Sequence, residues 1–310
     1  MQRKIKVKVP ATSGNLGPGF DVLGIALSLY NELEMTLIPK NKKDRAGSVE
    51  FKIFGEGKDS LPRDEKNIIW QSAKKVFNRA RFPLEKYNFK FQSLNRIPLS
   101  RGLGSSSAAI LGGLLAANAL LVNALDERDI LSLASESEGH PDNVVPALVG
   151  GLTVAENGNK KISYIRLDPP GDLRAVVCVP EYELSTVKAR SVLPKAVSFQ
   201  DALFNIKRVS RFLSAIQSKN YEHLREAMED KLHQPYRKKL VPGFDRVLEK
   251  GYQGGALGVA LSGAGPSIFA FAKENNSAKV ARNMEKGFLS AGYRSKSLVL
   301  ELNKKGSIVI

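Results

Sequence analysis

A glycine- and serine-rich segment that leads into a long uncharged run constrains this chain more than any other feature of its sequence. Residues 98–109 read PLSRGLGSSSAA, and residues 102–125 contain no charged side chain. The glycines allow a tight turn, and the compact apolar stretch 108–122 predicts a helix. Because glycine and serine fill the start of this run and Asn118 and Asn123 interrupt the rest, a helix buried in a protein core explains it better than a membrane span.

Two explanations fit the three serines at positions 105–107. Serine is a good N-cap, so a purely structural role would use one hydroxyl to accept a backbone hydrogen bond. A helix N-terminus also binds phosphate through its free N–H groups, and hydroxyls can ligate a magnesium ion that bridges the phosphates. Three hydroxyls are more than a cap uses, which favours phosphate. The segment lacks the lysine of the Walker pattern, and Ser107 stands where the dinucleotide-binding pattern has a glycine.

A second glycine-rich segment carries polar residues in apolar company. Residues 10–24 read PATSGNLGPGFDVLG, which predicts a loop, and they place Asn15 and Asp21 among leucine and phenylalanine residues. A carboxylate in such surroundings requires a cation or several hydrogen-bond donors nearby. A turn in which Asn and Asp bind their own backbone explains the same residues, so both explanations remain open.

Two further segments combine turn residues with polar or apolar groups. Residues 134–152 read ASESEGHPDNVVPALVGGL and gather acidic residues, His140 and Asn143 on a predicted polar turn. Residues 261–272 read LSGAGPSIFAFA, a glycine turn between apolar stretches. A serine hydrolase is disfavoured because the chain has no Gly-x-Ser-x-Gly sequence, and the His-Arg-Asp and Asp-Phe-Gly signatures of protein kinases are also absent.

The composition is that of a globular protein with an unusual charge. The net charge of +16 suits a nucleic acid, an anionic membrane or an acidic ligand. A solvated, lysine-rich surface also explains it, and the short basic runs and the aromatic content of 7% favour that explanation. The single cysteine, Cys178, cannot form an internal disulfide, which predicts a reducing cytoplasmic compartment. The three histidines show no zinc-binding spacing.

Hydrophobic periodicity predicts a mixture of strands and helices. The predicted strands are 4–9, 49–54, 88–94, 150–157, 161–168 and 173–180, with further strands within 256–272 and 293–302. The predicted helices are 67–80, the run after the serines, 126–139, 199–218, 221–233, 243–251 and 276–292. Strands and helices without strict alternation indicate an α+β chain. Turn residues at 155–170 suggest a boundary between domains at 1–160 and 161–310.

Together these segments resemble the GHMP superfamily of small-molecule kinases. PLSRGLGSSSAA is similar to the phosphate loop of the superfamily, and LSGAGPSIFAFA is similar to its third motif. PATSGNLGPGFDVLG resembles the first motif of the branch that phosphorylates L-homoserine, with Gly14 as a departure because alanine is more usual there. The resemblance extends from Pro10 to Phe271. It implies an N-terminal ATP-binding domain like domain 2 of ribosomal protein S5, a C-terminal α+β domain, and an active site in the cleft between them.

The resemblance also implies roles for particular residues. Those that would wrap the ATP phosphates, or lie near the adenine, are Pro98, Leu99, Ser100, Arg101, Gly102, Leu103, Gly104, Ser105, Ser106, Ser107 and Asn67. Ser105 or Ser106 would hold magnesium together with Glu136, and Glu138 is the alternative carboxylate. Those that would bind the substrate are Asn15 and Asp21 at its ammonium group, Arg190 and Arg237 at its carboxylate, and His140 in the same pocket. Asn143, Thr186 and His140 would lie near the hydroxyl that is phosphorylated, and no carboxylate is assigned as a general base.

The implied activity is transfer of a phosphoryl group from ATP, with Mg²⁺, to the hydroxyl of L-homoserine in threonine biosynthesis. A zwitterion needs a carboxylate beside its amine and a guanidinium beside its carboxylate, and the implied residues supply both. The resemblance further implies a cytoplasmic homodimer. The alternatives are another kinase of the superfamily, such as mevalonate kinase, and a basic nucleic-acid-binding protein. Spacing alone would leave Arg190 and Arg237 on the surface.

Overall fold

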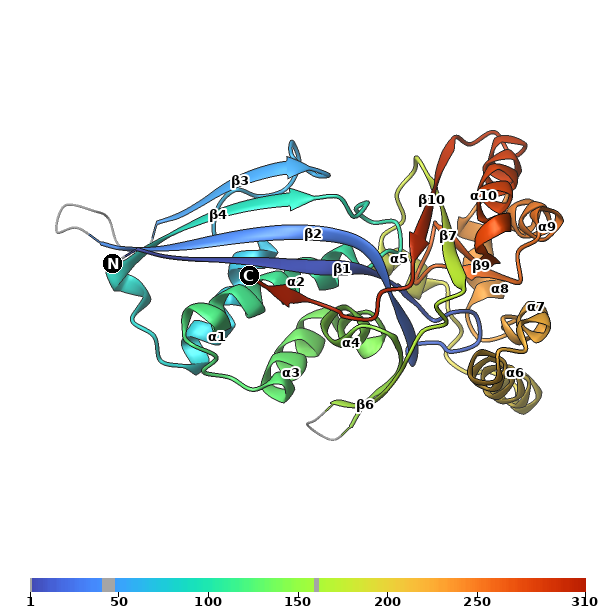
Figure 1. Cartoon of the computed structure of the whole chain (residues 1–310), viewed down its shortest axis with the longest axis horizontal. Coiled ribbons are helices and arrows are strands. Elements are labelled where there is room, and N and C mark those ends of the chain that lie inside the picture. The colour runs from blue at the N-terminus through green and yellow to red at the C-terminus, as the bar shows by residue number, and fades with distance from the viewer. Residues whose placement is uncertain (1, 41–47, 159–161) are drawn as a thin grey trace.

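The computed structural model describes residues 2–40, 48–158 and 162–310, which form two β-sheets with helices packed on them (Figure 1). The strands of the first sheet are β1 (Arg3–Gly14), β2 (Leu23–Pro39), β3 (Val49–Gly55), β4 (Tyr87–Asn95), β5 (Leu152–Asn157), β6 (Ile162–Leu167) and β11 (Ile308–Val309). β1 and β2 form a long antiparallel hairpin, β4 pairs with β2, and β3 runs parallel to β4. β5 joins the start of β2 and carries β6, and β11 pairs with β1. The hairpin therefore extends from the outer end of the molecule to its middle.

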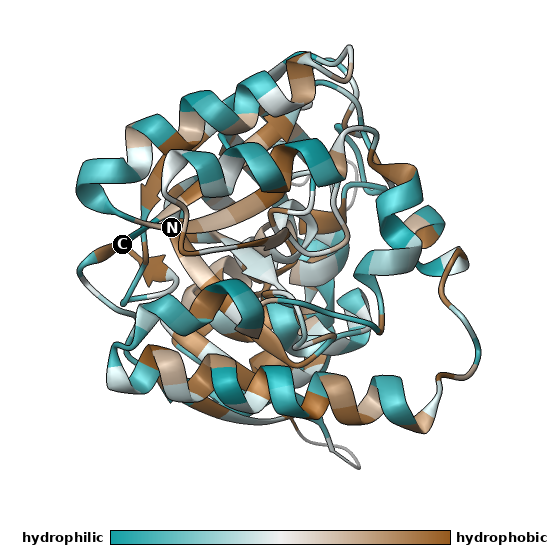
Figure 2. Ribbon diagram, turned by 90° about the vertical axis from the view of Figure 1, so that its right-hand side faces the viewer, coloured by the Kyte–Doolittle hydropathy of each residue, from teal (hydrophilic) through white to brown (hydrophobic). Residues whose placement is uncertain are grey.

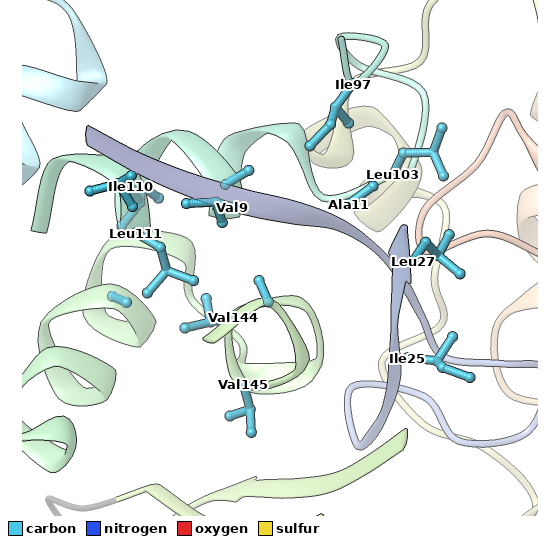
Figure 3. Close-up of a cluster of buried hydrophobic side chains, with 14 of the residues drawn as sticks. Val9, Ala11, Ile25, Leu27, Ile97, Leu103, Ile110, Leu111, Val144 and Val145 are labelled. Atoms are coloured by element: carbon cyan, nitrogen blue, oxygen red, sulfur yellow. The ribbon is translucent and has the colours of Figure 1, made fainter. Parts of the chain in front are cut away.

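Helices cover one face of the first sheet in the described part of the chain (Figure 1). They are α1 (Ile68–Arg79), α2 (Ser105–Leu120), α3 (Glu127–Glu138) and α4 (Pro141–Val149). The central helix is α2, whose Ile110 and Leu111 are fully buried near Val9 of β1 and Val144 of α4 (Figure 3). Most residues of α2 are buried, which explains why this helix carries no charge and confirms it as a core helix. The uncharged run continues past the helix end at Leu120 into residues 122–124, which are exposed.

The opposite face of the first sheet carries lysines and glutamates. Along β1 and β2 these residues alternate with buried apolar residues that face the helices. Lys4 lies 2.9 Å from Glu34, and Lys6 and Lys8 lie 3.3 and 3.6 Å from Glu32 on the neighbouring strand. Side chains of a strand alternate between its two faces, so this pattern leaves the charged set in solvent. Two carboxylates of the neighbouring strand therefore offset part of the positive charge of the first strand.

The second sheet has helices on both faces. Its strands, in the order β10-β7-β9-β8, are β10 (Ser295–Glu301), β7 (Leu173–Pro180), β9 (Ile268–Lys273) and β8 (Gly258–Leu261). The helices around it are α6 (Phe199–Ser218), α7 (Leu224–Ala227), α9 (Phe244–Gly254) and α10 (Glu274–Leu289). In Figure 2 these helices mix hydrophilic and hydrophobic residues, whereas the strands between them are mainly hydrophobic. Phe271 of β9 packs on Phe212 of α6, while Ala270, the residue before it, belongs to the core cluster that contains Met284 of α10.

The predicted α+β class with two parts is confirmed. The predicted boundary between residues 160 and 161 lies outside the described residues. The strand that follows it, β6, still pairs with β5 of the first sheet, and the C-terminal β11 returns to that sheet. Within the described ranges, no helix combines the length and apolar character that a membrane span requires.

Two predictions near glycine turns were wrong in their bounds. The sequence predicts a loop over 10–24, but β1 continues to Gly14 and β2 begins at Leu23, because the two strands pair as far as Gly14 and Gly24. The sequence also predicts a polar turn at His140. In the structure His140 occupies the N-cap position of α4, without a capping hydrogen bond from its side chain, and Asn143 already lies in the first turn of that helix.

The predicted helix 221–233 was wrong in its second half. A short 3₁₀ turn (Tyr221–His223) and α7 occupy its start, but α7 ends at Ala227. The carboxylate of Asp230 accepts hydrogen bonds from the backbone N–H groups of His233 and Gln234, at 2.9 and 2.6 Å. These bonds hold the start of a new helix, α8 (Gln234–Arg237), whose N-cap residue His233 makes no capping hydrogen bond with its own side chain.

Candidate active site

A cavity of about 190 Å³ collects residues from both halves of the chain. Its wall is formed by the loop after β1, the segment that leads into α2, the start of α4, the short helix α5 (Thr186–Ser191) and α8. The predicted site residues in the wall are Asn15, Asp21, Pro98, Ser100, Arg101, Gly102, Leu103, Gly104, Ser105, Ser106, His140, Asn143, Thr186, Arg190 and Arg237. The predicted residues that do not line it are Asn67, Leu99, Ser107 and Glu136.

The turn before α2 is held by close backbone packing. Gly102 and Gly104 have φ angles of +72° and +68°, in the left-handed region that favours glycine. A Cβ atom on Gly102 would lie 2.1 Å from the carbonyl oxygen of Ser262, and one on Gly104 would lie 2.0 Å from Oγ1 of Thr12. The Ser262 hydroxyl also donates to the Gly102 carbonyl at 2.7 Å. The turn is therefore fixed between β1 and the glycine turn that joins β8 to β9.

Gly102→Ala is expected to lower the free energy of unfolding by more than about 1 kcal/mol, because the new methyl group meets both a carbonyl oxygen and an unfavourable φ. Gly171→Ala is the matched control, since an added Cβ there meets no atom within 4 Å. The control is expected to be neutral or to gain roughly 0.4–1 kcal/mol from a less flexible unfolded chain. Urea unfolding of the two variants measures this difference, and equal small changes would show that the turn tolerates a side chain.

None of the three serines caps α2. The N-cap is Gly104, and no side chain accepts a hydrogen bond there among the described residues. Ser105 and Ser106 line the cavity, whereas Ser107 is fully buried and its hydroxyl has no partner in the described structure. The helix N-terminus and two hydroxyls thus remain available to a ligand, which favours the phosphate explanation over plain capping.

Arg101 in the same segment is used structurally. Its Nε donates to the carbonyl of Pro180 at 3.0 Å and its Nη2 to that of Glu181 at 2.6 Å, both at the end of β7. The backbone N–H of Leu184 in turn donates to the carbonyl of Ser100 at 3.0 Å. These bonds join the segment before α2 to the second sheet, so Arg101 positions the two halves of the cavity.

A second cavity, of about 300 Å³, adjoins the first and shares Ser100, Ser105 and Ser106 with it. Asn67 and Leu99 lie in its wall, and Asn67 caps α1 by accepting from the backbone N–H of Ile69 at 3.0 Å. Sequence analysis missed Ser93 in this wall. Its hydroxyl is buried without a hydrogen-bond partner in the described structure, and its place in a strand gave no signal in the sequence.

The structure separates the two candidate carboxylates of α3. Glu138, at the end of the helix, lines the first cavity with Ser105 and Ser106. Glu136 is exposed and lies in the wall of a different cavity with Ser132 and Ser135. Residues two apart on a helix point to nearly opposite sides, which is why both cannot face one site. Glu136 is thus displaced by Glu138 as the candidate metal ligand.

A buried imidazole–carboxylate pair lies at the start of α4. His140 Nδ1 is 2.5 Å from Oδ1 of Asp142, which is 1% exposed. Burial alone would lower the pKa of His140, but the hydrogen bond and charge of Asp142 outweigh it and raise that pKa. Asn143 donates to the same carboxylate at 3.2 Å and accepts from the Thr12 hydroxyl at 2.8 Å. Asp142 stood in the polar segment of the sequence without a predicted role.

The two predicted arginines lie in very different surroundings. Arg190 forms a bidentate pair with Asp21, with N–O distances of 2.7 and 3.0 Å. Arg237 is 1% exposed and has no carboxylate within ion-pair distance among the described residues. Burial, and then repulsion from Arg190, lower the pKa of Arg237 to about 10. A desolvated cation without an anion is a preformed binding site for an acid group.

Opposite charges therefore line one small cavity. Ligand atoms of Asp21, His140 and Asp142 lie within 4.8 Å of one another, a set that suits an ammonium group or a metal ion. The arginines suit a carboxylate, and the N-terminus of α2 suits phosphate. Such a site can hold a small zwitterion beside a phosphorylated ligand.

Two family models match the chain. The model for the N-terminal domain of GHMP kinases matches residues 67–151, and the model for their C-terminal domain matches residues 212–289. The chain belongs to the GHMP kinase family. The first match includes the turn before α2 with its serines.

Curated and solved GHMP kinases resemble the chain over nearly its whole length. The homoserine kinase of Carboxydothermus hydrogenoformans is 44% identical over 97% of this chain and 95% of its own. The homoserine kinase of Persephonella marina is also 44% identical, over 98% of this chain and 97% of its own. The crystal structure of homoserine kinase from Cytophaga hutchinsonii has a TM-score of 0.87 and 31% identity, and covers 99% of this chain and 97% of that chain.

Proposed function

We propose that this GHMP kinase transfers a phosphoryl group from ATP to the hydroxyl of L-homoserine, giving O-phospho-L-homoserine in threonine biosynthesis. The observation that carries the proposal is a single cavity in which a helix N-terminus with unused serine hydroxyls lies beside a carboxylate and two arginines. The name that the curated relatives carry supports the same substrate.

The ATP phosphates bind at residues 98–106 and the N-terminus of α2, and the nucleoside enters the adjoining cavity of about 300 Å³. Ser100, Ser105 and Ser106 line both cavities, so a nucleotide that fills the second one directs its phosphates into the first. Asn67 caps α1 and thereby shapes the nucleoside cavity.

The donors at this corner fit a magnesium ion. The hydroxyls of Ser105 and Ser106 and the carboxylate of Glu138 are hard oxygen ligands in one cavity wall. When bound, Mg²⁺ neutralises negative charge on the phosphates during transfer.

The charged residues bind the two ends of the amino acid. Asp21 accepts hydrogen bonds from the ammonium group, and Arg190 and Arg237 donate to the carboxylate. Asn15 lines the same cavity beside Asp21 and also holds this loop in place. Its Oδ1 accepts from the backbone N–H of Asp21 at 3.0 Å, and its Nδ2 donates to the Gly263 carbonyl at 2.8 Å.

Asn143, His140 and Thr186 align the hydroxyl that is phosphorylated. The amide oxygen of Asn143 is held by Thr12, so its Nδ2 faces Asp142 and the cavity. No carboxylate is assigned as a general base, as the family resemblance implies. His140 and Asn143 both bind Oδ1 of Asp142, which holds this carboxylate in place. Phosphoryl transfer has a loose transition state and depends mainly on alignment and charge stabilisation.

An ATP-consumption assay across L-homoserine, L-serine, L-threonine and mevalonate tests the substrate. The expected kcat/KM for L-homoserine exceeds that for L-serine by about 10- to 200-fold, the usual discrimination for one methylene. Mevalonate has a carboxylate but no ammonium group, so it cannot make the contact with Asp21 that the proposal gives to the substrate, and turnover should be undetectable. A preference for mevalonate would instead establish the alternative kinase of this family.

The nucleic-acid alternative predicts a different behaviour. Lysines of the first strand are paired with glutamates of its neighbour, and Phe54 is an exposed aromatic residue of the same sheet, whereas a stacking platform needs several. We expect only weak RNA or DNA binding that falls steeply with salt, as non-specific binding does. Electrophoretic mobility shifts at low and physiological salt measure it, and sequence-selective binding at physiological salt would support the alternative.

The proposal includes a cytoplasmic homodimer, as the family resemblance implies. Light scattering of the purified protein measures its mass in solution, and the expected value is twice the 33.9 kDa of one chain.

A further inference from the structure

Arg237 is oriented by a histidine that the reaction itself does not use. His233 lies one helical turn earlier, is 0% exposed, and does not line the cavity. Its Nδ1 is 3.3 Å from Nη1 of Arg237. The same Nη1 also donates to the carbonyl of Gly263 at 3.4 Å, and Nε donates to the carbonyl of Ala189 at 3.2 Å. Nη2 has no hydrogen-bond partner among the residues that the structure describes.

The tautomer of His233 follows from its other nitrogen. Nε2 lies 2.8 Å from the carbonyl oxygen of Gly17, which can only accept, so Nε2 carries the proton. In the neutral ring Nδ1 then has a free lone pair, and it accepts from the guanidinium of Arg237. Burial lowers the pKa of His233; the charge of Asp230 opposes this effect and that of Arg237 adds to it, and the net lowering keeps the ring neutral. A protonated ring would set two donors against each other at Nδ1.

The surroundings of His233 leave its ring little freedom. Phe20 stacks on it with a centroid distance of 5.2 Å and an interplanar angle of 25°. Asp230 fixes the backbone below it by accepting from the N–H groups of residues 232, 233 and 234 and from the side chain of Asn205. Because these four bonds occupy the carboxylate, Asp230 leaves the proton of Nε2 to Gly17, although Oδ2 lies 3.5 Å away.

We propose that His233 is a positioning residue that holds the inner edge of the Arg237 guanidinium through a neutral Nδ1 acceptor and so directs Nη2 toward the substrate carboxylate. This inference rests on the proposed function, because it needs a substrate with a carboxylate. It assigns a role in substrate selection to a residue that has no contact with the substrate.

Two substitutions separate the acceptor from the donor of the ring. His233→Gln keeps a donor near Nε2 for Gly17 but places no acceptor at Nδ1. His233→Asn keeps an acceptor near Nδ1 and gives up the bond to Gly17. His223→Gln is the matched control, since that histidine is exposed and carries the same substitution.

The readout is the preference for L-homoserine over 3-aminopropan-1-ol, which keeps the hydroxyl and ammonium groups but lacks the carboxylate. In His233→Gln, kcat/KM for L-homoserine is expected to fall about tenfold or more, the effect of a hydrogen bond to a charged group. The constants for 3-aminopropan-1-ol and the KM for ATP should hardly change, and His233→Asn should recover much of the preference.

An equal loss for both amino alcohols would assign His233 a purely structural role and overturn the inference, as would a His233→Asn variant that discriminates less than His233→Gln. An unchanged preference in both variants would overturn it as well. If the wild-type enzyme does not phosphorylate L-homoserine at all, the proposed function itself is wrong. That outcome is seen before any variant is made.

Discussion

Arg237→Ala is expected to lower kcat/KM for L-homoserine by about thirtyfold to several thousandfold and to leave the KM for ATP nearly unchanged. Truncating an arginine that binds a desolvated carboxylate costs roughly 2–5 kcal/mol, because the partner charge loses its counterpart. The side chain of Arg237 is 1% exposed, lines the cavity, and has no hydrogen-bond partner at Nη2 among the described residues. The proposed phosphate site, residues 98–106, contributes a different part of that wall. Steady-state kinetics with each substrate varied in turn measures both constants.

The control for this variant is Lys239→Ala, an exposed cation in the same basic run, which should change little, within about 0.5 kcal/mol. The free enzyme buries the Arg237 charge without a carboxylate, so Arg237→Met should keep or raise the melting temperature while substrate binding is lost. If Arg237→Ala left homoserine kinetics unchanged, the carboxylate assignment would be refuted. An effect on the KM for ATP alone would assign Arg237 to the nucleotide part of the cavity instead of the amino-acid part.

Glu138→Ala is expected to lower kcat by about a hundredfold to a thousandfold, even at saturating magnesium. The proposed reason is that the metal ion, which neutralises charge on the transferring phosphate, loses a ligand. Glu136→Ala in the same helix should keep nearly full turnover, since its side chain faces another cavity. The KM for L-homoserine should move little in either variant, because its charged ends contact other residues. A magnesium titration of kcat for both variants is the measurement.

Two outcomes of this pair of substitutions would contradict the assignment. Normal turnover in Glu138→Ala would remove it as a metal ligand. A loss found only in Glu136→Ala would return the role to that residue and contradict the orientation of α3. Thermal unfolding of both variants checks that neither loss comes from the fold, and both carboxylates are accessible enough for that to hold.

Features that depend on residues close together in the sequence could be predicted. The uncharged run 102–125 predicts a buried helix, and α2 is one, because a helix surrounded by the core has no side for a charge. The alternation of charged and apolar residues in the first strand predicts one solvent-exposed face, and its lysines do lie in solvent beside glutamates. The motif resemblance predicted most of the residues that line the cavity, because each motif contributes one short segment of its wall.

Predictions that needed a distant partner were less successful. The helical pattern over 221–233 could not show that the carboxylate of Asp230 binds the backbone that follows and starts a new helix. Composition predicted a loop over 10–24, because strand pairing of glycine and proline depends on the partner strand. Neither Ser93 nor His233 stood out, since burial gives their side chains a role that composition does not reveal.

The sequence by itself determined the fold class, the family and the segments that line the cavity, because turn residues, periodicity and motifs are local properties of the chain. Only the tertiary structure decided which charged side chains are paired, which are buried and which face the cavity. It paired Asp21 with Arg190, 169 residues apart, and it buried Arg237 from a basic run that spacing would leave in solvent. It also turned Glu138 toward the serines and Glu136 away from them. The physical reason is that desolvation and charge pairing arise from contacts between distant segments, which exist only after the chain has folded.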